Sequence, residues 1–440
     1  MKNKKWMAIL LGGIMAASLA APCSVSAAEK TTLTFWHAMG GTNGEVLQQI
    51  VDDFNASQDE IEIKAEYQGT YDDTITKLKA AMQSDSGLPD VCQMYDVGTK
   101  FMYDSGAVIP VEDKFESTGY DKSSVMDVIS SYYTVDGKQY AMPFNVSTPM
   151  LYYNKDVFEA AGLDPETPPT TYDEVLEDAK KIVESGAAPV GYSQAIYGWF
   201  FEQQLAGLGV TYGNNDNGRT EAVTAVDFDS NGGGLKVFDM WKKLYDSGYF
   251  EDYGTTTADT QTAFFSGQVG MIIESTAILK NAVDSSPFEV GTGYLPRIEQ
   301  NDEGGVIIGG GSLWLTDTGN EANEDAAWKF IEYITTPDVQ AKWSMGTGYF
   351  AINEKAYETD DMKAYLKENP NFETAINQLK DSPVNANTAG VLSGVQTEAR
   401  LTFNEIMPQV YDGKLTTQDA VDQLAASVNK AIENYNESIK

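Results

Sequence analysis

After residue 30, the chain alternates between strand-like and helix-like apolar patterns. The segments 31–37, 60–67 and 90–95 (TTLTFWH, EIEIKAEY and DVCQMY) have the alternation or the short apolar run of β-strands. Between them, apolar residues recur at helical spacing over 46–54 and 75–82. This order predicts parallel pairing through right-handed crossovers, and therefore an α/β domain.

The same alternation returns after residue 170. Thr171 to Glu174 form a capping box for a helix that we expect to stop at Gly186. Further strands are predicted at 188–193, 268–275 and 304–317, and further helices at 235–245, 322–335, 337–345 and 417–438. Because no low-complexity linker separates the halves, we expect two α/β lobes joined by strands and tight crossings.

The first 28 residues have the composition of a secretory signal peptide. A basic start is followed by the uncharged, mainly apolar run 6–21 and by small residues before Ala28. We expect cleavage there and export. A lipid anchor at Cys23 is not favoured, because Pro22 stands where a small residue is needed. Cys92 would then be the only cysteine, without a disulfide partner, and we expect it to be buried.

The net charge and the histidine content limit the classes of function that the chain can have. The chain has a net charge of −35, which argues against nucleic acid or an anionic membrane as a partner. His37 is the single histidine of the chain, so a histidine-based catalytic triad would have to use this residue. A zinc site of the usual histidine-rich or cysteine-rich kind is not expected. The glycines at 309–311 do not form a nucleotide-binding fingerprint, and 214–220 lacks the glutamate of a calcium loop. We therefore expect no cofactor and no enzyme.

Aromatic residues lie beside turns and small polar residues. They are Trp36, Tyr71, Tyr95, Tyr197, Trp199 and Tyr349. In open α/β sheets ligands bind beyond the carboxyl ends of strands, and aromatic faces there suit sugars and polyols. Core packing is the alternative for each of these residues taken alone.

An exported two-lobed chain that carries FFSGQVGMI (264–272) resembles the solute-binding proteins of ABC importers, in the large carbohydrate-binding class. Further stretches are similar to the branch that binds sn-glycerol 3-phosphate and glycerophosphodiesters: FWHAMGG (35–41), YQGTYDD (67–73), MYDVGT (94–99), PFNVSTPMLYYNKD (143–156), IIGGGSLWL (307–315) and TGYFAINEKAY (347–357). The resemblance implies a periplasmic-binding-protein-like fold, with two α/β lobes around a ligand cleft and a hinge of several crossings. It also implies a monomer that docks on ABC permease subunits.

The resemblance implies a set of ligand-binding residues. They are Tyr71, Asp96, Ser147, Ser275, Gly310, Tyr349, Arg400 and Trp199, with Trp36, His37, Ile196 and Tyr197 as further candidates. Serine hydroxyls, a glycine N–H, a phenol and an arginine fork suit a phosphate. Asp96 and Tyr71 suit glycerol hydroxyls.

Two positions depart from the family pattern. Asp96 replaces a glutamate, and Ile196 replaces the first tryptophan of a Trp-x-x-Trp pair whose second member is Trp199. Both changes leave room for a bulkier head group, such as that of glycerophosphocholine, or for a neutral oligosaccharide. A secreted hydrolase is the least favoured hypothesis.

By analogy with the class, three crossings link the lobes near 142–148, 306–313 and 347–352. One lobe is expected at 29–145 plus 312–349 and the other at 146–311 plus 350–440. The segment 143–156 then consists of two strand pieces in two lobes. Its polar residues face the cleft, where Ser147 can donate to a ligand.

Overall fold

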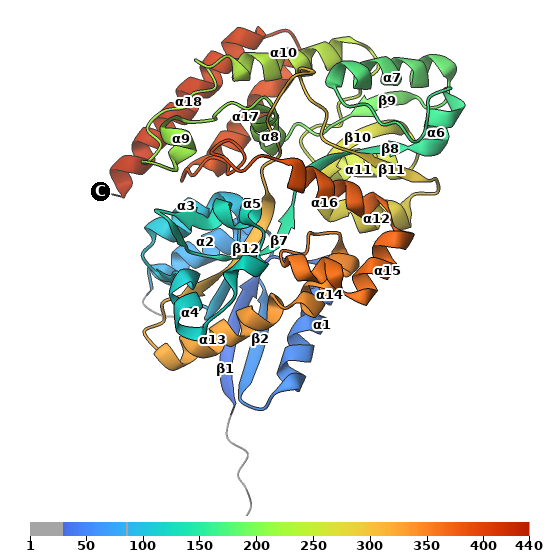
Figure 1. Ribbon diagram of the computed structural model, residues 1–440. Coiled ribbons are helices and arrows are strands. Elements are labelled where there is room, and N and C mark those ends of the chain that lie inside the picture. Colours follow the sequence, from blue (N-terminus) through green and yellow to red (C-terminus); the bar gives the residue numbers. More distant parts are fainter. Residues whose placement is uncertain (1–29, 85–86, 440) are drawn as a thin grey trace, which may run out of the picture.

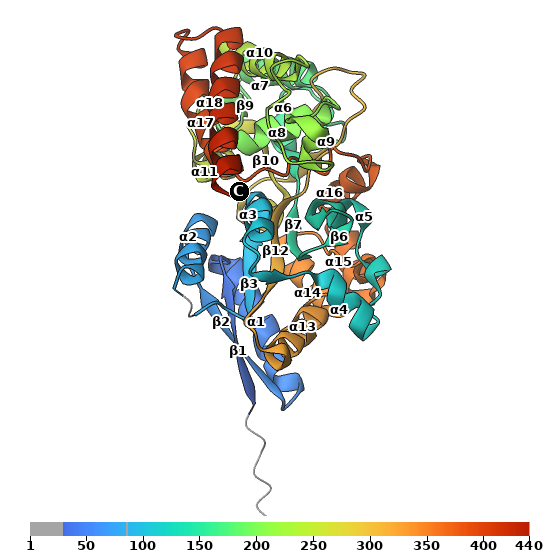
Figure 2. The same ribbon diagram turned by 90° about the vertical axis from the view of Figure 1, so that its left-hand side faces the viewer.

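The computed structural model describes residues 30–84 and 87–439 and has two lobes (Figures 1 and 2). The predicted signal peptide and Cys23 lie outside the described residues. In each lobe, helices pack around a β-sheet, and β7 and β12 run toward the junction between the lobes (Figure 1). The predicted α/β architecture is confirmed.

The sheet of the first lobe has the order β2-β1-β3-β12-β4, and β7 also pairs with β12. Its strands are β1 (Thr31–His37), β2 (Ile61–Tyr67), β3 (Val91–Tyr95), β4 (Val108–Ile109), β7 (Met142–Ser147) and β12 (Gly309–Thr316). The three strands predicted at the start of the chain pair in parallel, as expected, with β1 in the middle. β12 arrives from much later in the chain and pairs antiparallel with β3, β4 and β7.

Helices surround this sheet. They are α1 (Gly41–Ser57), α2 (Tyr71–Met82), α3 (Thr99–Asp104), α4 (Val111–Thr118), α5 (Asp127–Ser130), α13 (Glu321–Ile334) and α14 (Pro337–Thr347). A two-stranded hairpin, β5 (Thr134–Val135) with β6 (Lys138–Gln139), lies beside them. α2 begins with a capping box in which Thr70 and Asp73 satisfy each other's backbone N–H groups.

The sheet of the second lobe has the order β11-β8-β10-β9. Its strands are β8 (Pro149–Asn154), β9 (Val190–Ser193), β10 (Val269–Ser275) and β11 (Val290–Gly293). Side chains alternate along β8, so that Leu151 and Tyr153 join the core of the second lobe, whereas Met150 and Tyr152 join the core cluster that continues into the first. The sheet is therefore covered on both faces.

Several helices surround this second sheet or pack on the helices next to it. They are α6 (Lys155–Ala160), α7 (Tyr172–Ser185), α8 (Gly198–Gly207), α9 (Asn214–Gly218), α10 (Gly233–Asp246), α11 (Thr257–Phe265), α12 (Leu279–Ser285), α17 (Gln396–Tyr411) and α18 (Thr417–Ser438). α7 has the predicted capping box of Thr171 and Glu174, and it ends at Gly186 in the left-handed conformation. Cys92 is fully buried, as predicted.

Two further helices lie near the junction, α15 (Asp360–Glu368) and α16 (Asn371–Asp381). Residues Ala351, Ala356 and Met362, around α15, pack against Ala341 of α14. α16 instead contacts β11 of the second lobe. The expected residue boundaries of the lobes stay a prediction.

The segment 143–156 is divided between the two sheets, as expected. β7 ends at Ser147, Thr148 is the only residue between the strands, and β8 begins at Pro149. Thr276 N–H donates to the Thr148 carbonyl at 2.8 Å. The proline thus stands at a strand start, where a missing N–H does no harm.

The predicted strand over 304–317 is wrong in its first part, because the strand begins only at Gly309. The backbone groups of Ile307 form their hydrogen bonds with a side chain and not with a neighbouring strand. Its N–H donates to Gln203 Oε1 at 2.8 Å, and its carbonyl accepts from Gln203 Nε2 at 2.8 Å. The apolar run before Gly309 is therefore an extended segment, in which the side chain of Gln203 satisfies the backbone N–H and carbonyl of Ile307.

Candidate functional site

Asn145, in the middle of β7, organises a polar cluster of the first lobe, on a strand that runs toward the junction of the lobes. Its Nδ2 donates to the Tyr71 hydroxyl at 2.7 Å, and its Oδ1 accepts from Gln93 Nε2 at 2.7 Å. Gly310 faces its backbone with a φ of +91°, and a Cβ there would lie 1.9 Å from the Asn145 carbonyl oxygen. Only glycine fits this position.

Ser147, at the end of β7, is buried. Its hydroxyl makes no hydrogen bond to any residue in the described part of the chain. It is therefore free to bond to a ligand.

Three tyrosines lie close to Asn145. Tyr71 and Tyr95 stack with ring centroids 5.1 Å apart, and Tyr349 stacks on Trp343. Burial raises the pKa of Tyr71 and of Tyr349, while hydrogen bonding with Asn145 opposes the shift in each. These phenols therefore stay protonated at neutral pH and can both donate and accept hydrogen bonds.

Arg400, on α17, bridges two carboxylates. Its Nε and Nη2 donate to the two carboxylate oxygens of Glu202 at 2.7 Å each, and Nη2 also donates to Asp96 Oδ2 at 2.9 Å. Gln396 Nε2 donates to Glu202 Oε1 at 2.9 Å. Glu202 and Arg400 belong to the second lobe, whereas Asp96 follows β3 in the first. The pair Arg400–Asp96 therefore joins the lobes.

All three charged groups are buried. Burial alone would lower the pKa of Arg400, but the carboxylates of Asp96 and Glu202 raise it further above its ordinary value. Burial raises the pKa of Glu202, and the contact with Arg400 opposes that shift. Arg400 is therefore charged at any physiological pH. Its Nη1 makes no hydrogen bond to a described residue.

Tyr197 and Trp199 form an aromatic wall beside Arg400. Tyr197 is the N-cap of α8, and the Arg400 guanidinium lies 6.0 Å from the centre of its ring. Trp199 lies against Gly309, where an added Cβ would come within 2.8 Å of the indole. The indole N–H of Trp199 is buried without a hydrogen-bond partner among the described residues. A buried unpaired donor at a cleft suits a ligand oxygen.

Ser275, at the end of β10, has its hydroxyl engaged, because it accepts from Ala277 N–H at 3.1 Å. Its neighbour Glu274 is buried and accepts from Gln261 Nε2 at 2.8 Å and from Ser275 N–H at 2.6 Å. Burial raises the pKa of Glu274 from 4.5 to about 7. Burial raises the pKa of the Tyr197 phenol, and the charge of Glu274 adds to that shift.

The other three candidates bond elsewhere. Trp36 Nε1 donates to Glu66 Oε2 at 3.0 Å across the paired strands β1 and β2. His37 Nδ1 accepts from Met39 N–H, and burial lowers the pKa of the imidazole to about 4. Ile196 packs in the core of the second lobe. The structure therefore brings Tyr71, Asp96, Tyr349 and Arg400 together. No hydrogen bond between described residues joins Trp36, His37 or Ile196 to these four.

Sequence reasoning missed Glu202, Gln396 and Glu274. Glu202 begins a polar run, Glu202 to Gln204, inside a helix whose first nine residues are all buried. Polar residues within an otherwise apolar helix indicate a buried hydrogen-bond network, and this pattern could have identified Glu202 from the sequence. Gln396 and Glu274 gave no comparable signal, because one lies at a helix start and the other near a strand end.

The described residues contain no group of three or more His, Cys, Asp or Glu side chains placed to hold a metal ion. Among residues 30–84 and 87–439, no helix has the length and apolar character needed to cross a membrane.

Comparison with known proteins identifies the family. A family model described as bacterial extracellular solute-binding protein matches residues 49–374. The chain belongs to this family. It is therefore a solute-binding protein and not an enzyme. It is 31% identical to the sn-glycerol-3-phosphate-binding periplasmic protein UgpB of Escherichia coli K12, over 93% of this chain and 94% of that protein.

Solved structures share the fold of this solute-binding protein. UgpB from Mycobacterium tuberculosis in complex with glycerophosphocholine has a TM-score of 0.79 at 20% identity, over 93% of this chain and 100% of that one. The cyclic α-maltosyl-1,6-maltose binding protein from Arthrobacter globiformis has a TM-score of 0.76 at 26% identity, over 92% and 100%. Two-lobed proteins with phosphodiester and with saccharide ligands thus resemble this chain.

Proposed function

We propose that this protein is the extracytoplasmic substrate-binding component of an ABC importer and binds a glycerophosphodiester such as glycerophosphocholine, or sn-glycerol 3-phosphate. The observation that carries the proposal is Arg400, a buried arginine at the junction of the lobes that lies beside the ring of Tyr197. The unpaired indole N–H of Trp199 lies against Gly309, which pairs with Ser147 and its free hydroxyl. A phosphate requires such a fork together with several neutral donors.

The two carboxylates suggest how the site takes its ligand. Glu202 lies in the same lobe as Arg400, so it stays paired when the lobes separate. Asp96 lies in the other lobe, so opening releases one edge of the guanidinium. A ligand phosphate then occupies that edge, and closure brings Asp96 and Tyr71 onto the hydroxyls of the glycerol.

The charge balance favours the diester. One arginine faces two carboxylates, and Glu274 adds a third acidic group nearby. A dianionic phosphomonoester would meet repulsion there, whereas a zwitterionic diester brings a single negative phosphate and a cationic head group. Tyr197 and Trp199 offer aromatic faces to a quaternary ammonium. We therefore expect glycerophosphocholine to bind more tightly than sn-glycerol 3-phosphate.

Calorimetric titration tests this proposal with sn-glycerol 3-phosphate, glycerophosphocholine and maltotriose. We expect heat from the phosphate esters and none from maltotriose. Arg400→Ala should weaken binding of the esters by roughly 100-fold, because it removes a charge-assisted pair. Lys430→Ala, which removes an exposed cation on α18, is the control and should leave ester binding unchanged. Unchanged ester binding by Arg400→Ala would contradict the proposal.

A neutral oligosaccharide is the second candidate. The observation that favours it is the double pairing of Arg400, which leaves no net positive charge for an anion. The titration separates the two, because maltotriose would then give the heat and the phosphate esters none.

The remaining features follow the class. We propose that the mature chain is exported, acts as a monomer in the periplasm or at the outer face of the cytoplasmic membrane, and delivers its ligand to two membrane permease subunits. Cleavage after the signal peptide, without a lipid on Cys23, is the expected processing. Mass spectrometry of the secreted chain checks it directly.

A further inference from the structure

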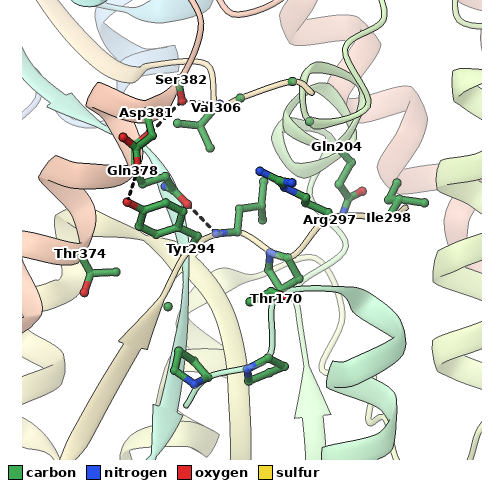
Figure 3. A pocket seen from close by; sticks show the side chains of 18 of the residues that line it. Thr170, Gln204, Tyr294, Arg297, Ile298, Val306, Thr374, Gln378, Asp381 and Ser382 are labelled. Carbon is green, nitrogen blue, oxygen red and sulfur yellow. Dashed lines mark hydrogen bonds between the residues drawn. The ribbon is translucent and has the colours of Figure 1, made fainter. Parts of the chain in front are cut away.

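The second lobe contains a separate cavity of about 570 Å³ (Figure 3). It lies between residues 168–170, the segment 292–306 after β11, and α16. None of the residues that the sequence singled out for ligand binding lines it. The cavity is therefore distinct from the cleft between the lobes, and its volume suits a small molecule.

The cavity walls are fixed by hydrogen bonds. The Tyr294 hydroxyl donates to Asp381 Oδ2 at 2.7 Å, and Leu295 N–H donates to Gln378 Oε1 at 2.5 Å (Figure 3). On another side, Arg297 N–H donates to the Thr170 carbonyl at 2.9 Å. The chain's own hydrogen bonds thus hold the walls in place, which lowers the cost of binding a ligand.

The buried polar side chains of the wall already have partners. Gln378 Nε2 donates to the Pro149 carbonyl at 2.7 Å. Gln204 donates to the Tyr172 hydroxyl at 2.8 Å and accepts from Trp241 Nε1 at 2.6 Å. These groups shape the cavity, and they leave recognition to a different residue.

Arg297 is that residue. Its guanidinium is directed toward the cavity, between Val306 and Gln204 (Figure 3), and it makes no hydrogen bond or ion pair with a described residue. The sequence has only three arginines. Arg219 is bonded to the carbonyls of Tyr132, Ala389 and Gly390, and Arg400 to the cleft carboxylates. Among the described residues, Arg297 is the arginine whose guanidinium makes no hydrogen bond. Burial raises the pKa of the nearby Asp302 carboxyl, and the charge of Arg297 opposes that shift.

The rest of the lining combines polar side chains with an apolar surface. Its apolar side chains include Pro168, Pro169, Leu295, Pro296, Ile298 and Val306. Such a surface gains free energy by covering an apolar group, at roughly 25 cal/mol per Å² removed from water. Asp381 on the side of Tyr294 disfavours a ligand with two negative charges.

We propose that this cavity is a second ligand site, which binds a small organic carboxylate with an apolar body. The carboxylate accepts both hydrogen bonds of the Arg297 fork, and the apolar body covers the prolines and aliphatic side chains. The proposal does not depend on the nature of the cleft ligand.

The test uses 3-phenylpropionate and octanoate, each with its neutral amide, titrated into the full mature protein by calorimetry and by saturation-transfer NMR. We expect the acids to bind and the amides to bind much more weakly. Arg297→Gln should weaken the acids by roughly tenfold or more, and Arg297→Lys, which keeps the charge without the fork, by less.

Two control experiments distinguish binding in this cavity from binding in the cleft. Arg400→Ala should leave acid binding unchanged, and saturating glycerophosphocholine should not displace the acids. The proposal is overturned if neither acid binds, if the amides bind equally well, if Arg297→Gln has no effect, or if a cleft ligand competes. Because Arg297 is exposed, its variants should unfold at the same temperature as the parent, which checks that the fold is intact.

Discussion

Arg400 forms ion pairs with two carboxylates, one in its own lobe and one in the other lobe. Glu202 binds it within one lobe through two hydrogen bonds, whereas Asp96 binds it across the cleft through one. A bidentate buried pair is hard to separate, because breaking it leaves an uncompensated charge. Glu202 is therefore the group that sets how much positive charge the arginine can offer to a ligand.

Replacing Glu202 by glutamine tests this role. Glu202→Gln keeps the shape and one acceptor but removes the negative charge. We expect the affinity for sn-glycerol 3-phosphate to rise by about tenfold, with a smaller rise for glycerophosphocholine. Glu398→Gln, which changes an exposed acid on α17, the helix of Arg400, is the control and should change neither. A fall in affinity for both esters, measured by calorimetry, would show that the carboxylate is needed for positioning alone.

Glu274 predicts a pH dependence of stability. Its pKa is about 7 in the folded protein against an ordinary 4.5. Between these values the folded state keeps a proton that the unfolded state has lost, so the free energy of unfolding falls as pH rises, by about 1.4 kcal/mol per pH unit for this group. Glu274→Gln mimics the protonated acid and should remove this part of the slope.

Urea unfolding at pH 5, 6, 7 and 8 measures the effect. The variant should be more stable than the parent above pH 7, by a few kcal/mol at most. Glu177→Gln, an exposed acid of the same lobe, should keep the slope of the parent. Parallel slopes for Glu274→Gln and the parent would contradict the assignment.

The residue pairs of the cleft could not have been predicted from the sequence. Arg400 lies 198 positions from Glu202 and 304 from Asp96, and nothing local links them. The resemblance pointed to Arg400 and Asp96 individually, whereas Glu202 required the fold that brings α8 against α17. Local signals did better: the capping box at Thr171 and the left-handed Gly186 were both predictable from neighbouring residues.

At the level of elements, β7 and β12 are the strands on which the cleft depends. They pair antiparallel, with a register shift between Gly311 and Ser312. Their polar and glycine residues look like flaws in a buried strand, yet they place Asn145 and Ser147 at the cleft. The apolar run at 304–308 misled the prediction, because a strand and an extended segment bonded to one side chain have the same apolar pattern.

Gly310 should be the most sensitive glycine of this pair. Gly310→Ala places a Cβ 1.9 Å from the Asn145 carbonyl oxygen in a backbone with φ of +91°, so the strands must separate. We expect a loss of about 2–4 kcal/mol in unfolding free energy. Gly319→Ala is the control, because Gly319 also has a positive φ, of +70°, but open space around it.

The control should lose only about 1 kcal/mol, the cost of the left-handed backbone. Urea denaturation of both variants separates conformation from contact. Equal losses would show that the approach of Asn145 to Gly310 contributes nothing beyond backbone strain.

At the level of the whole molecule, three of the contacts that join the lobes come from α17 and α18. They are Arg400 with Asp96, the Tyr95 hydroxyl with Thr397 at 2.7 Å, and the Tyr435 hydroxyl donating to Asp104 Oδ2 at 2.7 Å. All three connect α17 or α18 to the region around β3 and α3 (Figure 2). The closed arrangement therefore has stabilising contacts of its own, before a ligand adds any.

Tyr435→Phe should shift this balance without touching the ligand. The ring keeps its packing on Gly394, where an added Cβ would lie 2.0 Å from it, and only the hydrogen bond to Asp104 is lost. A hydrogen bond to a charged group contributes about 1.5–3 kcal/mol, so the unliganded closed state should lose population by roughly tenfold or more. Ligand affinity should also fall, because closure of the lobes then costs more free energy.

Tyr249→Phe is the control. It removes a tyrosine–carboxylate hydrogen bond within one lobe and should change neither the population of the closed state nor the ligand affinity. Single-molecule energy transfer between the lobes measures the populations, and an unchanged distribution in Tyr435→Phe would mean that this contact follows closure and does not stabilise it.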